Sequence, residues 1–182
     1  EYFDEKDSGY PRLIEMADNL GLDDQKAKLL HNYAYQQFRY GYYDKAFESY
    51  RQALKLREPS HSHYLVSLEG YLNAATKLGL TSETEFLRLA KEGYTLANQL
   101  KDTMFQHYFQ LHIYKIQNQK EQYYHYLETE VYPYFKQMGY ALAAETYEIK
   151  LFDHYMEKEE MDLANKYALP ILEKYRKNNE LV

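Results

Sequence analysis

Apolar side chains recur along the chain at helical spacing. Three segments, 10–20, 46–56 and 90–100, carry apolar or small residues at the same offsets of four, seven and ten positions from their first residue. Residues at these offsets lie on one face of an α-helix, so each segment predicts an amphipathic helix whose stripe is buried against a neighbour. The stripe continues in two later segments, at Leu127, Val131 and Tyr134 and at Ala164, Ala168 and Ile171.

The five stripes form a repeat. Their first residues are separated by 36, 44, 37 and 37 positions, and a period of this length is typical of stacked helix pairs. The longer interval requires an insertion, which we place within 79–85. Pro133 and Pro170 are also 37 positions apart. They predict a bend shared by the last two repeats, with a break used for function as the alternative.

The stretches between the stripes predict partner helices near 25–41, 60–78, 103–118 and 140–157. We therefore expect a single all-α repeat domain over 1–182, with a lone helix at 10–20 followed by antiparallel pairs at 25–57, 60–100, 103–138 and 140–178. These helices, about nine, should stack as a right-handed α-solenoid. The chain does not begin with Met, and we expect it to be a fragment of a longer protein.

The best-preserved unit, 27–59, resembles the tetratricopeptide repeat (TPR). Small residues at Ala34 and Ala46 let its two helices approach closely, Tyr50 fills the gap between them, and Ala53 admits the next repeat. The positions that match the motif are Leu30, Ala34, Gly41, Tyr43, Ala46, Tyr50, Ala53 and Pro59. The resemblance implies a TPR-like superhelix.

The degenerate later repeats, rich in Tyr, Lys, Asn, Gln and Leu, add a second resemblance. With proline in the late helices, the chain is similar to the C-terminal peptide-sensing domains of the peptide-pheromone receptors and transcriptional regulators of Gram-positive bacteria (RRNPP type). This resemblance implies a quorum-sensing domain that binds a short, reimported peptide. It also implies a separate N-terminal output domain that binds DNA or a response-regulator protein, and nothing in this chain resembles a DNA-reading unit.

Charge and composition limit the classes of binding partner that we expect. The chain has 22 Lys and Arg against 28 Asp and Glu, a net charge of −6, which disfavours nucleic-acid binding by this segment itself. DNA binding would require the missing N-terminal domain. The absence of Cys fits a reducing compartment, so we expect a cytoplasmic protein. No apolar run is long enough for a membrane span, and the chain does not begin as a signal peptide does. A homodimer is compatible with the sequence.

The sequence offers no catalytic motif, so we predict that the protein is not an enzyme. It contains no G-x-S-x-G, no glycine-rich phosphate loop and no H-E-x-x-H. His61 and His63 could chelate one ion, but a polar turn at the start of a helix is the simpler interpretation. We expect no metal and no cofactor.

The 23 tyrosines suggest where a ligand binds. Most should be packing residues, but aromatic rings beside polar residues on the first helix of each pair could line a concave groove for an extended peptide. The predicted peptide-binding residues are His31, Asn32, Tyr35, Phe38, Arg39, Tyr71 and Asn73. A Lys and Asn clamp for a C-terminal carboxylate, as in TPR co-chaperones, is disfavoured because His31 and Tyr35 stand at its positions.

We therefore interpret the chain as a non-enzymatic module that binds a peptide or protein segment, the sensor of an intracellular regulator. The main alternative is a TPR scaffold or adaptor for protein–protein assembly that has no small peptide ligand. A helical-bundle enzyme is a distant third interpretation. The pattern does not specify the ligand sequence, the output partner or the exact register of the later repeats.

Overall fold

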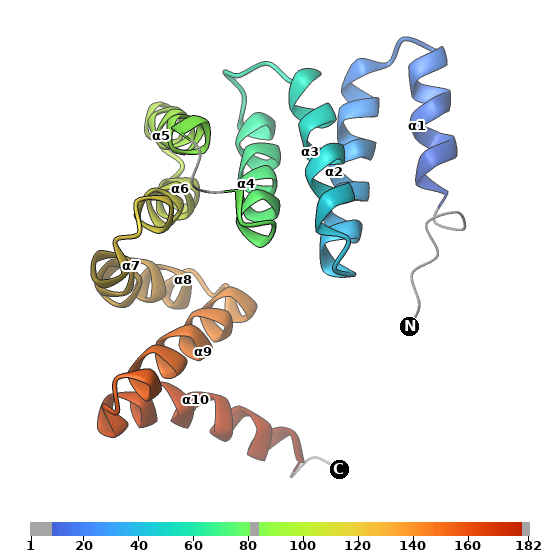
Figure 1. The fold of residues 1–182 in the computed structure, drawn as a ribbon. Helices are drawn as coiled ribbons and strands as arrows, with labels where there is room; N and C mark the ends of the chain where they lie inside the picture. The colour runs from blue at the N-terminus through green and yellow to red at the C-terminus, as the bar shows by residue number, and fades with distance from the viewer. Residues whose placement is uncertain (1–8, 81–83, 180–182) are drawn as a thin grey trace. The chain divides into compact units, whose positions relative to one another are not determined.

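The computed structural model describes residues 9–80 and 84–179, and every regular element in these ranges is helical. Residues 81–83 of the predicted insertion lie outside them. The segments α7, η2 and α8 run on as one helix, so the described residues hold nine helices, which confirms the predicted all-α fold. The elements are α1 (Tyr10–Asn19), α2 (Asp23–Arg39), α3 (Tyr43–Lys55), α4 (Ser62–Lys77), α5 (Thr84–Gln99), α6 (Thr103–Ile116), α7 (Lys120–Tyr126), η2 (Leu127–Val131), α8 (Tyr132–Gln137), α9 (Ala141–Glu157) and α10 (Met161–Asn179) (Figure 1).

Packing divides the chain, which the sequence analysis treats as one domain, into two compact units. The N-terminal unit is Glu1–Gln117 and the C-terminal unit is Asn118–Val182. Within the N-terminal unit, α1 packs on α2, α2 on α3, α3 on α4 and α5 on α6. Within the C-terminal unit, α8 packs on α9 and α9 on α10. Each unit therefore consists of neighbouring helices that pack in chain order.

Small residues set the close approach of the helices in the N-terminal unit. Ala34, Ala46 and Ala53 are fully buried, and the Tyr50 ring fills the space beside them with 3% of its surface exposed. These are the positions on which the TPR resemblance depends. These positions require small side chains, because a larger side chain at the same place would push the helices apart.

Two helix-interior glycines mark still closer contacts. A Cβ atom on Gly70 of α4 would overlap the ring of Tyr50, and a Cβ atom on Gly93 of α5 would overlap the ring of Phe109. Glycine inside a helix costs about 1 kcal/mol relative to alanine. The packing of an aromatic ring directly on the backbone offsets that cost.

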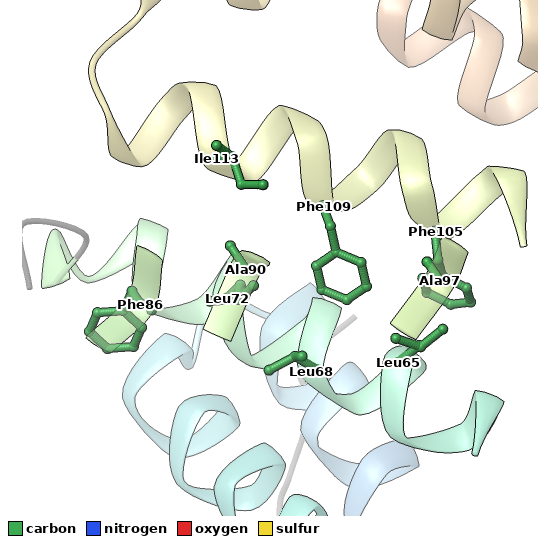
Figure 2. Close-up of a cluster of buried hydrophobic side chains, with 10 residues drawn as sticks. Leu65, Leu68, Leu72, Phe86, Ala90, Ala97, Phe105, Phe109 and Ile113 are labelled. Carbon is green, nitrogen blue, oxygen red and sulfur yellow. The ribbon is translucent and has the colours of Figure 1, made fainter. Parts of the chain in front are cut away.

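An extensive apolar cluster of the N-terminal unit joins α4, α5 and α6. Figure 2 shows Phe105, Phe109 and Ile113 on α6 pointing toward the other two helices. The Phe109 ring is completely buried. The buried members of the cluster are Leu65, Leu68, Leu72, Ala75, Phe86, Ala90, Ala97, Phe105, Phe109 and Ile113.

The two prolines that predicted a shared bend have different surroundings. Pro133 lies in the first turn of α8, directly after the π-helical segment η2, where the Tyr132 N–H donates to the Leu127 carbonyl. Pro170 lies inside α10. Because proline lacks an N–H, the carbonyl four residues earlier loses its helical donor, and a π-turn is one way to rearrange the neighbouring hydrogen bonds. The repeated proline therefore does not produce the same local structure twice.

Most helix-to-helix turns contain one residue in the left-handed region. Glycine occupies this place at Gly21, Gly41, Gly79 and Gly139, with φ between 64° and 83°. Lys101, Asn118 and Glu159 occupy it elsewhere, with φ of 56°, 55° and 61°. This is the usual conformation just after a helix C-terminus, and it favours glycine because an L side chain is strained there.

Candidate functional site: the A-helix face

The first helices of successive pairs in the N-terminal unit form a continuous surface. Helix α4 contacts both α2 and α6, and His31 Nδ1 on α2 lies 3.2 Å from Ser67 Oγ on α4. Beside these contacts each helix carries a stripe of exposed or half-buried side chains. We call this stripe the A-helix face, and it consists of Asn32, Tyr35, Arg39, Glu69, Asn73, Lys77, Tyr108 and Lys115.

Three of the predicted peptide-binding residues lie together on α2. Asn32, Tyr35 and Arg39 follow one another at helical spacing and are all exposed, Tyr35 to 53% of its surface. An amide, an aromatic ring and a guanidinium thus share one stripe of this helix. These groups supply hydrogen bonds, an apolar wall and a positive charge to whatever lies against them.

Two other predicted residues face α4 and are half-buried. The His31 ring lies edge-on to the Tyr50 ring, with 5.4 Å between centroids. Phe38 lies edge-on to Tyr43 at 5.2 Å and packs against the small cluster that contains Ala74 of α4. Both residues support the helix contact at the edge of the A-helix face.

Burial keeps the imidazole of His31 neutral at pH 7. It lowers the pKa of His31 to about 4, and the nearby charge of Arg57 adds to the effect. The Arg57 guanidinium is itself held by the backbone carbonyl of His63. His31 therefore contributes a neutral hydrogen-bonding ring and no positive charge.

The two predicted residues on α4, Tyr71 and Asn73, lie in different surroundings. Asn73 lies on the A-helix face and donates a hydrogen bond from its amide to the carboxylate of Glu69, one turn earlier. The Tyr71 ring instead stacks on Phe47 of α3 at 4.4 Å and lies 5.9 Å from the Phe86 ring of α5. Tyr71 belongs to the packing between helices, so it takes no part in the proposals below.

Four members of the A-helix face are not among the predicted peptide-binding residues: Glu69, Lys77, Tyr108 and Lys115. A signal was present for the two lysines, because Arg39, Lys77 and Lys115 are spaced 38 positions apart and each lies in the last turn of its helix. Their proximity depends on how α4 packs on α6, which the spacing alone does not determine.

Two cavities of the N-terminal unit lie away from this face. One, of about 280 Å³, is lined by residues near the turn between α3 and α4, including His61 and His63. The other, of about 450 Å³, lies between Tyr64 and α5. The described part of the chain contains no group of three or more His, Asp or Glu side chains arranged to hold a metal ion. Among the described residues, no third ligand therefore joins His61 and His63 in a metal-binding group.

A hydrogen-bonded network of tyrosines and glutamates organises the C-terminal unit. Glu128, in the π-helical segment η2, accepts hydrogen bonds from the hydroxyls of Tyr155, at 2.5 Å, and Tyr167, and from the Lys166 ammonium at 3.2 Å. Burial alone would raise the pKa of Glu128, but these donors outweigh it and hold the pKa below its ordinary value. The network joins η2 to α9 and α10 and is satisfied within the unit.

The chain was compared with known families, curated sequences and solved structures, and one solved structure has a similar fold. No known protein family and no curated protein sequence matches the chain. A solved structure does match: the apo form of the quorum sensor NprR from B. thuringiensis, with a TM-score of 0.72 and 19% sequence identity. The alignment covers 92% of this chain and 50% of that one, so the chain spans about half the length of the quorum sensor.

None of the described helices is both long and apolar enough to cross a membrane. The predicted fold is confirmed by the likeness to the quorum sensor, which has a TM-score of 0.72 and covers 92% of this chain. The chain therefore has the fold of a TPR-like helical repeat domain, of the kind found in a quorum sensor.

Proposed function

We propose that this chain is a peptide-binding module, the sensor part of a cytoplasmic regulator of the quorum-sensing type. The observation that carries the proposal is the row of aromatic, amide and cationic side chains on α2, α4 and α6, the first helices of successive pairs. An extended peptide needs partners for its backbone polar groups and apolar walls for its side chains. Asn32 and Arg39 would serve the first need, and the exposed ring of Tyr35 the second.

The likeness to a quorum sensor supports this proposal through the fold. Fold does not by itself define function, so the residues of the A-helix face must carry the argument. No output role is assigned to a residue of this chain, because the regulator's action on DNA or on a partner protein would belong to another domain.

The test is calorimetry on the full chain with synthetic peptides encoded by short reading frames beside its gene. Replacing Tyr35 by Ala should weaken binding by about 2 kcal/mol, roughly thirtyfold, if its ring is a central contact. The matched control is Tyr40→Ala, which removes another exposed ring, directly after the last residue of the same helix and not part of the A-helix face. Equal losses for the two variants would move the site elsewhere.

A scaffold that assembles proteins, including copies of itself, is the second candidate. It is favoured by exposed leucines on the last helix pair: Leu142 is 80% exposed, Leu169 56% and Leu172 62%. Phe135 stands two positions after Pro133, as Leu172 does after Pro170, yet it is only 1% exposed, because Tyr147 of α9 and Tyr140, the residue before α9, pack on its ring. Failure of every peptide to bind, together with concentration-dependent self-association, would favour the scaffold.

A further inference from the structure

Each first helix of the pairs in the N-terminal unit ends in a cation. Arg39 closes α2, Lys77 closes α4 and Lys115 lies in the last turn of α6. Cations at this end of a helix interact favourably with the helix dipole. The dipole accounts for each cation separately but not for the placement of one cation beside the next.

Helices α4 and α6 are in contact, and Lys77 and Lys115 hold the equivalent place in them, the last turn of each helix. Partial burial lowers the pKa of Lys115, and the charge of Lys77 lowers it further. The Lys77 ammonium lies 5.7 Å from the centre of the Tyr43 ring, and that ring contacts Phe38, the neighbour of Arg39. The row Lys115, Lys77, Arg39 thus follows the ends of three helices along one edge of the A-helix face.

Carboxylates do not neutralise this row. The ion pairs between described residues use other cations, and they leave Arg39, Lys77 and Lys115 without a carboxylate within 4.0 Å. In a chain with 28 acidic residues and a net charge of −6, adjacent unpaired cations are unexpected. Like charges held side by side destabilise the folded state unless an anion joins them.

We propose that this row binds a carboxylate of the extended peptide ligand, seated between Lys77 and Lys115. The inference rests on the proposed peptide-binding function and specifies the chemistry of its ligand. The peptide would carry either an acidic side chain or its free C-terminal carboxylate to the ends of α4 and α6. Asn73, one turn before Lys77 on the same stripe, is positioned to hydrogen-bond the adjoining peptide backbone.

The first experiment compares melting temperatures at low salt without any peptide. If Lys115 is held beside Lys77 for an absent anion, Lys115→Gln should raise the melting temperature of the full chain, and added salt should diminish the gain. If Lys115 serves only the helix dipole, Lys115→Gln should lower the melting temperature, because the favourable charge is lost. Lys55→Gln is the matched control, because Lys55 closes α3 and its charge acts favourably on Glu48. A lower melting temperature for Lys115→Gln would overturn the proposal.

The second experiment uses a synthetic library of random heptapeptides with free C-termini, selected by affinity on the full chain. Selected peptides are then remade with Asp or Glu changed to Asn or Gln, or with an amidated C-terminus. Neutralising one carboxylate should weaken binding at least tenfold on the native chain and have no effect on the Lys77→Gln, Lys115→Gln double variant. Which substitution matters distinguishes a side-chain carboxylate from the terminal one.

The outcomes separate the two proposals. Selected peptides that bind equally well with and without carboxylates would overturn the carboxylate site and leave peptide binding standing. A library from which nothing binds would overturn peptide binding, and the carboxylate site with it.

Discussion

The two units repeat the same helix pair but fill its interior differently. In the N-terminal unit, Phe109 and Tyr50 pack directly on the glycines of a neighbouring helix. In the C-terminal unit, Glu128 joins three segments through hydrogen bonds from Tyr155 and Tyr167. Apolar contacts tolerate small changes in geometry and do not depend on pH, whereas a partly buried carboxylate must keep both its charge and its donors. One repeat architecture thus accommodates two kinds of interior with different vulnerabilities.

The largest effect expected is on the N-terminal unit. Phe109→Ala should lower its free energy of unfolding by about 3–5 kcal/mol, because the removed ring leaves a cavity. Gly93→Ala alone should lower it by about 1–3 kcal/mol, because the new methyl group meets the ring. In the Phe109→Ala background the same glycine substitution should raise it by about 1 kcal/mol, since only the gain in helix propensity remains. Hydrogen exchange of the α5 and α6 amides measures all three.

Lys91→Ala on the exposed side of α5 is the control for this cycle and should have little effect in either background. If Gly93→Ala has the same sign with and without the Phe109 ring, the glycine is not retained for that ring.

The next effect concerns the C-terminal unit. Glu128→Gln should destabilise it at pH 7 by about 1–3 kcal/mol, because two tyrosine hydroxyls and Lys166 lose a charged acceptor. The folded-state pKa of Glu128 lies below its ordinary value of 4.5, so its contribution is present above that pH and is lost as the pH falls through the folded-state pKa. The deficit of the variant should therefore shrink toward pH 3. Urea unfolding monitored by exchange of α9 and α10 amides provides the measurement.

Glu130→Gln removes an exposed carboxylate from the same π-helical segment and should leave stability nearly unchanged. A deficit for Glu128→Gln that stays constant from pH 7 to pH 3 would show that the carboxylate charge is unimportant.

The N-terminal unit has its own acid-sensitive element in His31. Its folded-state pKa is about 4 against an ordinary value of 6.5, so as the pH falls from 6.5 toward 4 the unfolded chain binds a proton that the folded chain does not. The free energy of unfolding of the N-terminal unit should decline over this interval by on the order of 1 kcal/mol. His31→Gln should make the stability measured by hydrogen exchange of the α2 and α4 amides less dependent on pH over this interval. His63→Gln, at an exposed site, should leave the decline as it is, and an unchanged slope for His31→Gln would contradict the assignment.

The smallest effect should be the same in both units. Lys101→Gly and Glu159→Gly relieve a left-handed side chain, one in each unit, and should each raise stability by about 0.5–1 kcal/mol. Thermal unfolding of each variant tests this. A gain confined to one unit would indicate that the other turn is stabilised by contacts of its side chain.

The sequence predicted the parts of the fold that depend on helical phase. The TPR resemblance predicts Ala34, Ala46 and Ala53 as close-packing positions, and all three are fully buried. Gly70 and Gly93 were not identified, because a glycine inside a helix reads as a weak point until the ring packed on it is known.

The candidate site was less predictable. Asn32, Tyr35 and Arg39 share a stripe because they belong to one helix, and phase alone placed them together. Tyr71 was assigned to the groove by register on α4, but its ring packs between α3 and α5, where Phe47 and Phe86 offer apolar partners. The closeness of Lys77 and Lys115 arises from a contact between two helices, and no local pattern reports it.

The left-handed turns have a consequence for how such a chain can lengthen. Because nearly every hairpin closes through the same backbone conformation, a duplicated helix pair brings its own joints and needs no new loop to be invented. Even the two non-glycine turns with long side chains, at Lys101 and Glu159, keep this conformation. Gain or loss of a whole pair is then a smaller step for the gene than insertion of a few residues inside a helix, where the stripe would fall out of phase.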